Sequence, residues 1–309
     1  MDPDGYAAFL PERYRSAVFE PVHDHWDAPG VRVHLARVPR PQAPARLLIL
    51  HGAGGHSGAL WPLAALAAGA GFEVLAPDLP PYGRTVAADP AAVRYPDWVA
   101  LVCDLVRAER AADGRPLAVL GASMGGLLGY EVAARTGLID HVLATCLLDP
   151  TDPAARRAAM RRPGPAGPAP ALARAAARVA GRVRIPIRWV VDIAAMSRNP
   201  ALSRRCATDP RGGGVRVPVG FLASWLTFAH TPPERFTAAP VTLVHPALDA
   251  WTPPELSVGF VQRIPSRTQV VLLEECGHFP VEEPGLSQLV DTLARVSGEL
   301  AGSAAPPAP

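Results

Sequence analysis

The sequence predicts an α/β protein with a mainly parallel sheet that is covered by helices on both faces. Short continuous apolar runs, such as residues 47–50, recur along the chain and are typical of buried parallel strands. Segments with apolar residues at helical spacing alternate with these runs, as in residues 98–106. This alternation is the pattern of βαβ units, in which each crossover helix packs on the sheet.

The composition is that of an ordinary globular protein. Among 309 residues, 49% are hydrophobic and 19% are charged, and the net charge of +2 favours neither nucleic acid nor another polyanion as a partner. No run approaches 18 apolar residues and no apolar signal segment follows Met1, so we expect a cytoplasmic protein without a membrane span. Four widely spaced cysteines without a C-x-x-C pair predict reduced, buried thiols, with neither metal nor cofactor: Cys103, Cys146, Cys206 and Cys276.

The first elements expected are an antiparallel hairpin with strands at residues 17–19 and 31–35. His23 and His25 fall in its connection, where a solvated loop is favoured over a metal pair because no further ligands accompany them. The buried strand at residues 47–50 then ends in a glycine-rich turn before a helix at about 58–70. That turn lacks the G-K-[ST] of a P-loop.

A G-x-S-x-G sequence occupies residues 121–125, between an apolar strand at 117–120 and a helical pattern at 125–134. In a nucleophile elbow, such a strand-to-helix turn holds the serine, here Ser123, in a strained conformation with its hydroxyl exposed. Flanking glycines let strand and helix approach each other. Alone, the pentapeptide also fits an ordinary βα turn.

The α/β pattern stops after a strand at residues 142–148 and resumes with a strand at 241–244. The interval 151–238 is too long for a βα connection and predicts an inserted helical cap, with helices at 171–183 and 187–197. It carries fifteen arginines and four acidic residues, which we interpret as a solvated surface rather than a nucleic-acid site. Residues 1–150 and 239–300 form the expected core, and residues 301–309 a disordered tail.

Asp249 and His278 each follow the end of a predicted strand, as Ser123 does. Because the carboxyl ends of parallel strands meet at one edge of the sheet, these three residues are expected in the same crevice. Asp249 could instead cap the next helix. Asp149, at the end of another predicted strand, is the alternative acid.

Over roughly residues 15–300 the chain resembles the α/β-hydrolases, and within them the capped monoacylglycerol-lipase-like serine esterases. The shared features are the chain order Ser123, Asp249, His278, the His51-Gly52 turn, the loop at 78–83, and the position of the cap after the sixth core strand. The resemblance implies an eight-stranded sheet and an oxyanion hole formed by the N–H groups of Ala53 and Met124. Pro246 departs from the glycine common in the family and predicts a stiffer acid loop.

These residues predict acyl transfer to water through an acyl-serine. Ser123 attacks, His278 takes its proton, and Asp249 orients the imidazole. The expected substrate is a small-molecule ester with an apolar acyl group. The same residues also fit a thioesterase, a lactonase, an acyltransferase or a non-catalytic ligand-binding protein.

Three further residues are candidates for contact with the substrate. His56 either contacts substrate or caps the following helix, and Trp189 and Trp225 either line an acyl pocket or pack the core of the cap. The sequence leaves the acyl length, the leaving group and the oligomeric state open.

Overall fold

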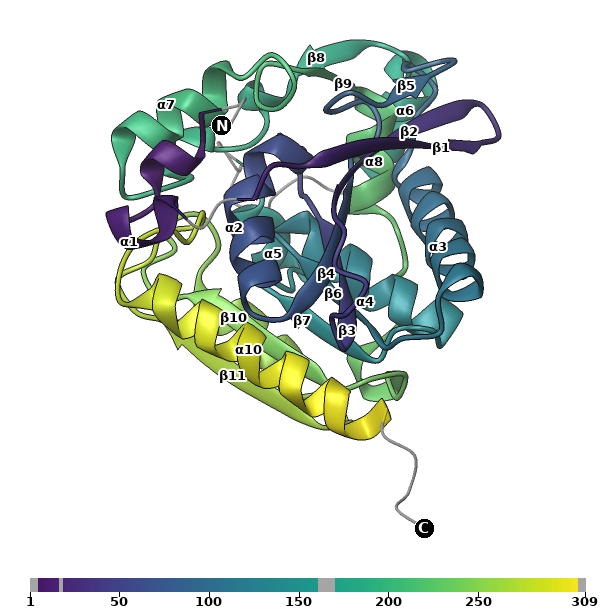
Figure 1. Cartoon of the computed structure of the whole chain (residues 1–309). Coiled ribbons are helices and arrows are strands. Elements are labelled where there is room, and N and C mark those ends of the chain that lie inside the picture. The colour runs from purple at the N-terminus through teal and green to yellow at the C-terminus, as the bar shows by residue number, and fades with distance from the viewer. Residues whose placement is uncertain (1–4, 17–18, 161–169, 305–309) are drawn as a thin grey trace.

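The computed structural model describes residues 5–16, 19–160 and 170–304. A twisted central sheet with helices around it dominates the described chain (Figure 1). The main path of this sheet holds eight strands, in the spatial order β1 (Val22–Ala28), β2 (Val31–Val38), β4 (Phe72–Pro77), β3 (Ala45–Leu50), β6 (Leu117–Gly121), β7 (His141–Ala144), β10 (Val241–Pro246) and β11 (Thr268–Leu273). A short β5 (Val86–Ala87) pairs with β2. From β4 to β11 neighbouring strands are parallel, which confirms the predicted fold.

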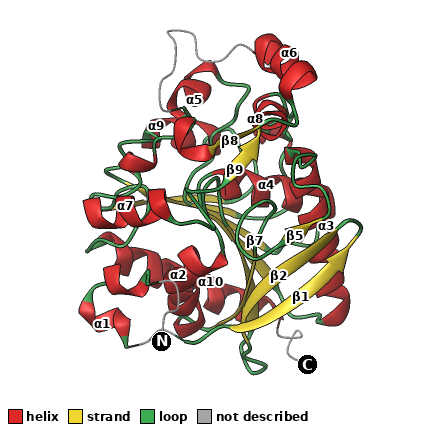
Figure 2. Cartoon of the chain, turned by 90° about the horizontal axis from the view of Figure 1, so that it is seen from above, coloured by secondary structure: helices red, strands yellow, loops and turns green. Residues whose placement is uncertain are grey.

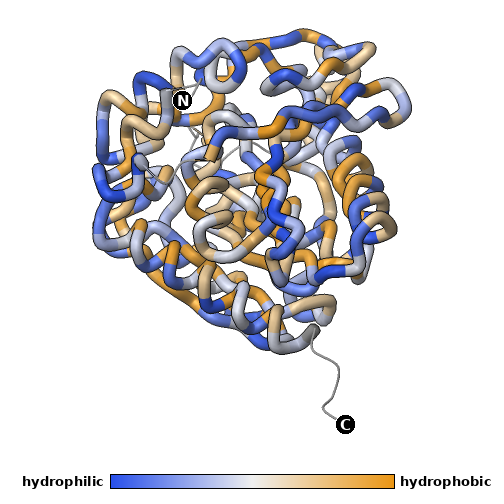
Figure 3. The backbone as a smooth tube through the Cα atoms, in the orientation of Figure 1, coloured by the Kyte–Doolittle hydropathy of each residue, from blue (hydrophilic) through white to orange (hydrophobic). Residues whose placement is uncertain are grey.

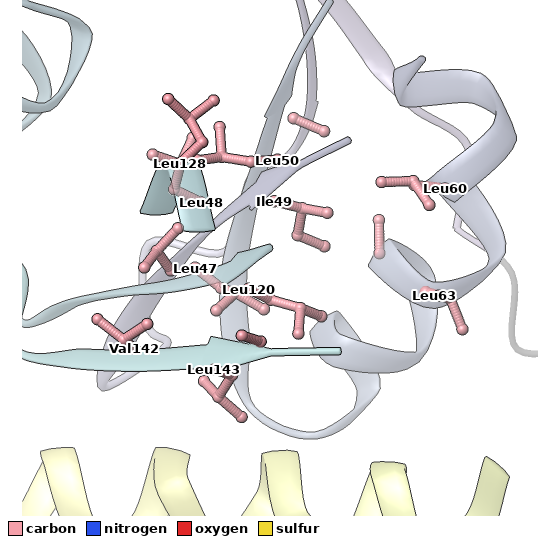
Figure 4. Packing of buried hydrophobic residues seen from close by; sticks show 14 of the residues in the cluster. Leu47, Leu48, Ile49, Leu50, Leu60, Leu63, Leu120, Leu128, Val142 and Leu143 are labelled. Carbon is pink, nitrogen blue, oxygen red and sulfur yellow. The ribbon is translucent and has the colours of Figure 1, made fainter. Parts of the chain in front are cut away.

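Helices cover both faces of the sheet (Figure 2). On one face, α2 (Ser57–Gly69) packs with α10 (Gly285–Ala304), and on the other α3 (Tyr95–Ala112) packs with α4 (Met124–Thr136). Every residue of β3 is buried, as its continuous apolar run predicts. Figure 4 shows β3 between Leu60 and Leu63 of α2 on one side and Leu128 of α4 on the other. Figure 3 shows that orange, hydrophobic stretches alternate with blue, hydrophilic ones along the chain.

The opening hairpin exists, but its first strand is displaced from the predicted position. Residues 17–18 of the expected strand lie outside the described residues, and β1 begins at Val22. His23 and His25 therefore lie on a strand and not in a loop. His23 Nδ1 lies 2.9 Å from His34 Nε2, so imidazoles pair here across the hairpin. A short 3-10 helix, η1 (Ala7–Phe9), and α1 (Glu12–Arg15) precede the hairpin.

Residues 151–238, here called the insert, separate β7 from β10 in the chain. Its helices are α5 (Pro153–Ala158), α6 (Pro170–Ala180), α7 (Pro200–Thr208) and α8 (Val219–Leu226), and its strands are β8 (Arg184–Pro186) and β9 (Arg216–Pro218). The helix predicted at 171–183 corresponds to α6. The helix predicted at 187–197 is wrong, because two 3-10 turns, η2 (Ile187–Trp189) and η3 (Ile193–Ala195), occupy that stretch. Another short 3-10 turn, η4 (Pro233–Arg235), ends the insert.

The last helices complete the core. Helix α9 (Pro254–Val261) packs on β10, and α10 continues through residues 301–304, where a disordered tail was expected. The rest of that tail, residues 305–309, lies outside the described residues. Within the described chain, no helix combines the length and hydropathy that a membrane span requires. All four cysteines are buried and free.

Candidate active site

Ser123 occupies a tight turn between β6 and α4. Its φ of 55° and ψ of −124° lie in a region that L-residues rarely adopt, as expected for a nucleophile elbow. A Cβ atom at Gly125 would lie 2.3 Å from the carbonyl oxygen of Leu50, so only glycine permits this approach of helix to strand. The Ser123 N–H donates to Thr145 Oγ1 at 3.0 Å, which fixes the turn from the end of β7.

The turn after β3 lies directly against the elbow. A Cβ atom at Gly52 would lie only 3.0 Å from the backbone nitrogen of Met124, the first residue of α4. His51 holds this turn, since its Nδ1 donates to the Gly52 carbonyl and its Nε2 accepts from the Leu79 N–H, each at 2.8 Å. Burial lowers the pKa of His51 to about 4, which keeps the imidazole neutral in this role.

Asp249 and His278 form a buried pair. His278 Nδ1 donates to Asp249 Oδ2 at 2.7 Å, and Thr252 Oγ1 donates to the same oxygen at 2.6 Å. The other carboxylate oxygen accepts the N–H groups of Trp251 and Thr252, both at 2.9 Å. Burial raises the pKa of Asp249, but the charge and hydrogen bonds of His278 and Thr252 outweigh it and lower the pKa to about 2. Asp249 thus pairs with His278 and also caps its own loop.

The free face of His278 borders the cavity that Ser123 lines. Because Nδ1 donates to Asp249, the lone pair of the neutral imidazole is on Nε2. This atom is buried and has no hydrogen-bond partner among the described residues, Ser123 included. Both residues line one cavity of about 50 Å³. The alternative acid, Asp149, instead accepts the N–H of Thr151 at 2.8 Å.

A second, larger cavity of about 200 Å³ extends from Ser123 toward the insert. Its wall is apolar apart from Ser123 and Thr252, and it includes both predicted oxyanion donors: Ala53, Ser123, Met124, Leu127, Leu148, Ala159, Met160, Ile185, Val190, Val191, Leu222, Trp225, Leu226, Trp251 and Thr252. Core and insert therefore both contribute to the wall. It does not include His278.

The structure separates the three residues that were expected to contact substrate. Trp225 lines the larger cavity. Trp189 does not, because it lies on the 3-10 turn η2 and is 65% exposed, so its placement in the pocket is corrected. His56 caps α2, since its Nδ1 accepts from the Gly58 N–H at 3.1 Å, and it lines neither cavity of Ser123.

The sequence-based interpretation missed three polar contributors to this region. Thr252 supports the carboxylate of Asp249, Thr145 holds the elbow amide, and Tyr6 lines the smaller cavity. Thr252 carried a signal, because a hydroxyl three residues after an acid is within reach of its carboxylate in a tight loop. Tyr6 carried none, since only tertiary packing brings it to the site.

The chain is similar to known proteins in sequence and in fold. The model of the alpha/beta hydrolase family matches residues 47–287. No curated protein sequence matches the chain. Similar solved structures include a monoacylglycerol lipase from Paleococcus ferrophilus, with a TM-score of 0.67 and 23% identity over 87% of this chain and 98% of that one.

Two further structures are similar at lower identity. One is a soluble variant of monoglyceride lipase from Saccharomyces cerevisiae in complex with a substrate analog, with a TM-score of 0.72 and 17% identity over 91% of this chain and 96% of that one. The other is Est1E from Butyrivibrio proteoclasticus with bound ferulic acid, with a TM-score of 0.60 and 18% identity over 90% and 99%. At these sequence identities, the structural similarity shows that the fold is shared.

Proposed function

The chain belongs to the alpha/beta hydrolase family, and from this we propose that it is a serine hydrolase cleaving carboxylic esters of apolar acyl groups. One observation carries the proposal. Ser123, at a strained elbow, lines the same cavity as His278, whose Nδ1 is bonded to the buried carboxylate of Asp249. This is the arrangement of a nucleophile, a general base and the group that orients the base.

The proposed reaction proceeds in two acyl transfers. Ser123 Oγ attacks the ester carbonyl carbon while His278 Nε2 takes the hydroxyl proton, and the ester C–O bond then breaks as Nε2 returns that proton to the leaving oxygen. A water molecule attacks the acyl-serine in the same way, with its proton passing through Nε2 to Ser123. The carboxylate of Asp249 stabilises the imidazolium formed in each step.

The oxyanion of each intermediate would lie at the N–H groups of Ala53 and Met124. The close approach of Gly52 to the Met124 nitrogen supports this placement, because it brings the turn after β3 beside the first turn of α4. The N-terminus of α4 adds the positive end of a helix dipole. Each donor of this kind contributes roughly 3 kcal/mol to transition-state stabilisation.

The apolar wall of the larger cavity favours a substrate with an apolar acyl group. In this proposal the insert acts as a cap over the cavity. Nearly all of its wall is hydrocarbon. Since an apolar cavity of about 150 Å³ holds benzene, one of about 200 Å³ holds an acyl chain of roughly eight carbons. We therefore propose medium-chain esters as substrates.

The test combines labelling by a fluorophosphonate with hydrolysis of methyl esters whose acyl chains have two to sixteen carbons. Hydrolysis is measured by the release of acid. We expect the wild type to be labelled and to turn over medium-chain esters fastest. Ser123→Ala should lose labelling and at least about 10⁴-fold in kcat. Ser303→Ala, on the exposed end of α10, is the matched control and should behave as wild type. A folded wild type that is neither labelled nor active would refute the proposal and favour a ligand-binding protein.

A further inference from the structure

The two cavities of Ser123 differ in one respect that assigns their roles. In the proposed reaction, the leaving oxygen takes its proton from His278 Nε2, so the leaving group must lie in space that His278 borders. His278 lines the smaller cavity and not the larger one, whereas Ser123 lines both. On this chemistry, the smaller cavity holds the leaving group and the larger one the acyl chain.

Tyr6 forms one wall of the smaller cavity, although it precedes the first strand of the sheet. Its side chain lines the cavity together with Ser123 and His278, and the residue is only 2% exposed. Its ring stacks on Phe279, the neighbour of His278 in the chain, with centroids 6.4 Å apart and an interplanar angle of 11°. The position of the ring is thus coupled to the loop that carries the candidate base.

A buried carboxylate anchors this ring from the insert. The Tyr6 hydroxyl donates to Asp209 Oδ2 at 2.7 Å, and His56 Nε2 donates to the same oxygen at 3.0 Å. Asp209 Oδ1 accepts the N–H of Arg211 at 2.9 Å. Burial raises the pKa of Asp209, but the bonds from His56 and Tyr6 outweigh it and hold the pKa below its usual range, so the carboxylate stays charged. The wall is therefore fixed to both the insert and the start of α2.

The smaller cavity has little volume and is partly open to solvent. A cavity of about 50 Å³ exceeds the roughly 10–15 Å³ that is needed to hold one water molecule, and it is far below the roughly 150 Å³ that holds benzene. It accommodates a leaving group of about two heavy atoms, such as methanol or ethanol. Glycerol, with six heavy atoms, exceeds the volume that is available while Tyr6 is in place.

We infer that Tyr6 determines leaving-group specificity and makes the enzyme prefer esters of small alcohols. This inference rests on the proposed function, because it requires cleavage at Ser123. The residue acts as a wall that Asp209 and Phe279 hold in place, and its truncation enlarges the smaller cavity.

The experiment compares two octanoate esters, methyl octanoate and 1-monooctanoylglycerol, by kcat/KM. We expect the wild type to prefer the methyl ester by about tenfold, since misfit of a few atoms in a narrow site has a cost of this order. Tyr6→Ala should bring the ratio to within about twofold, whereas Tyr6→Phe, which keeps the ring, should retain most of it. Tyr14→Phe, on the same N-terminal segment but bonded to Ser287, is the control and should leave the ratio unchanged.

Fluorophosphonate labelling separates the outcomes. If the wild type is not labelled, the proposed function fails, whatever the ratio. If it is labelled and active but Tyr6→Ala keeps the wild-type ratio, or if the wild type cleaves both esters equally, the inference alone is overturned. Should Tyr6→Ala not fold, Tyr6→Met provides the same comparison, because its flexible chain leaves part of the ring volume open.

Discussion

Thr252 is the residue whose hydroxyl connects the candidate acid to the candidate base. Its Oγ1 donates to Asp249 Oδ2 at 2.6 Å and lies 3.3 Å from His278 Nδ1. It therefore helps to fix the carboxylate oxygen that the imidazole contacts. Its backbone N–H holds the other oxygen, so one residue constrains both ends of the carboxylate.

Replacing Thr252 by valine removes this donor at nearly constant volume. A hydrogen bond to a charged group contributes about 1.5–3 kcal/mol, so we expect kcat to fall by about tenfold or more with little change in KM. Thr252→Ser restores the hydroxyl and should recover most of the rate. Wild-type kcat in Thr252→Val would show that the bond has no role in positioning.

A single residue could be predicted from the sequence when the pattern that identifies it is local. Ser123 and His278 were identified because short local patterns place them at strand ends, and the structure puts both at one cavity. Trp189 and Trp225 looked alike in the sequence, yet one is exposed and the other lines the larger cavity. The positions of these two side chains depend on how the insert packs on the core, and no local sequence pattern predicts that packing.

At the scale of the elements, backbone contacts constrain the β6–α4 unit tightly. Gly121, Gly125 and Gly126 each approach a carbonyl oxygen so closely that a Cβ atom would lie within 2.4 Å of it. For Gly126 that oxygen belongs to Cys146. These contacts leave no room for side chains between the strand and the helix.

Gly125→Ala should therefore destabilise the protein by about 3 kcal/mol, the upper range of overpacking, because the added Cβ meets the rigid backbone of β3. Gly298→Ala is the matched control, since it lies in α10 and a Cβ atom added there would meet nothing within 4 Å. It should stabilise by about 0.5–1 kcal/mol through helix propensity. Urea unfolding of both variants measures the difference, and equal effects would contradict this account.

Elements with a long apolar run or a clear helical face were predicted with the correct type, as β3 and α3 show. Short elements of the insert were not. Strands β8 and β9 have three residues each and end at Pro186 and Pro218, so they give no alternation to detect. The stretch 187–197 has apolar residues at helical spacing, but η2 and η3 each close with an i→i+3 bond. The single i→i+4 bond, from the Val191 N–H to the Ile187 carbonyl, is not continued into a helix.

At the scale of the whole molecule, buried histidines make stability depend on pH. Burial lowers the pKa of His141 and of His230 to about 4 each, from 6.5. Between these values the unfolded chain binds more protons than the native one, so stability falls as the pH falls from 6.5 to 4. Below about pH 4, protonation of Asp249, whose pKa is lowered to about 2, removes further stability.

We expect the free energy of unfolding to drop by roughly 3 kcal/mol per buried histidine between pH 6.5 and pH 4. Urea unfolding at several pH values measures the slope. His141→Gln, which retains a polar group near Thr242, should reduce that slope by about one proton. An unchanged slope in this variant would show that His141 does not titrate as its burial requires.

The sheet order also governs when the parts of the site meet during folding. Ser123 lies in a unit of neighbouring elements, β6, α4 and β7, whereas Asp249 and His278 follow β10 and β11, beyond the whole insert. Strand β10 pairs directly with β7, so the chain must close this long interval before the base reaches the nucleophile. On refolding from urea, we expect helical circular dichroism to return before fluorophosphonate reactivity. Simultaneous recovery would mean that the two halves of the site assemble in one step.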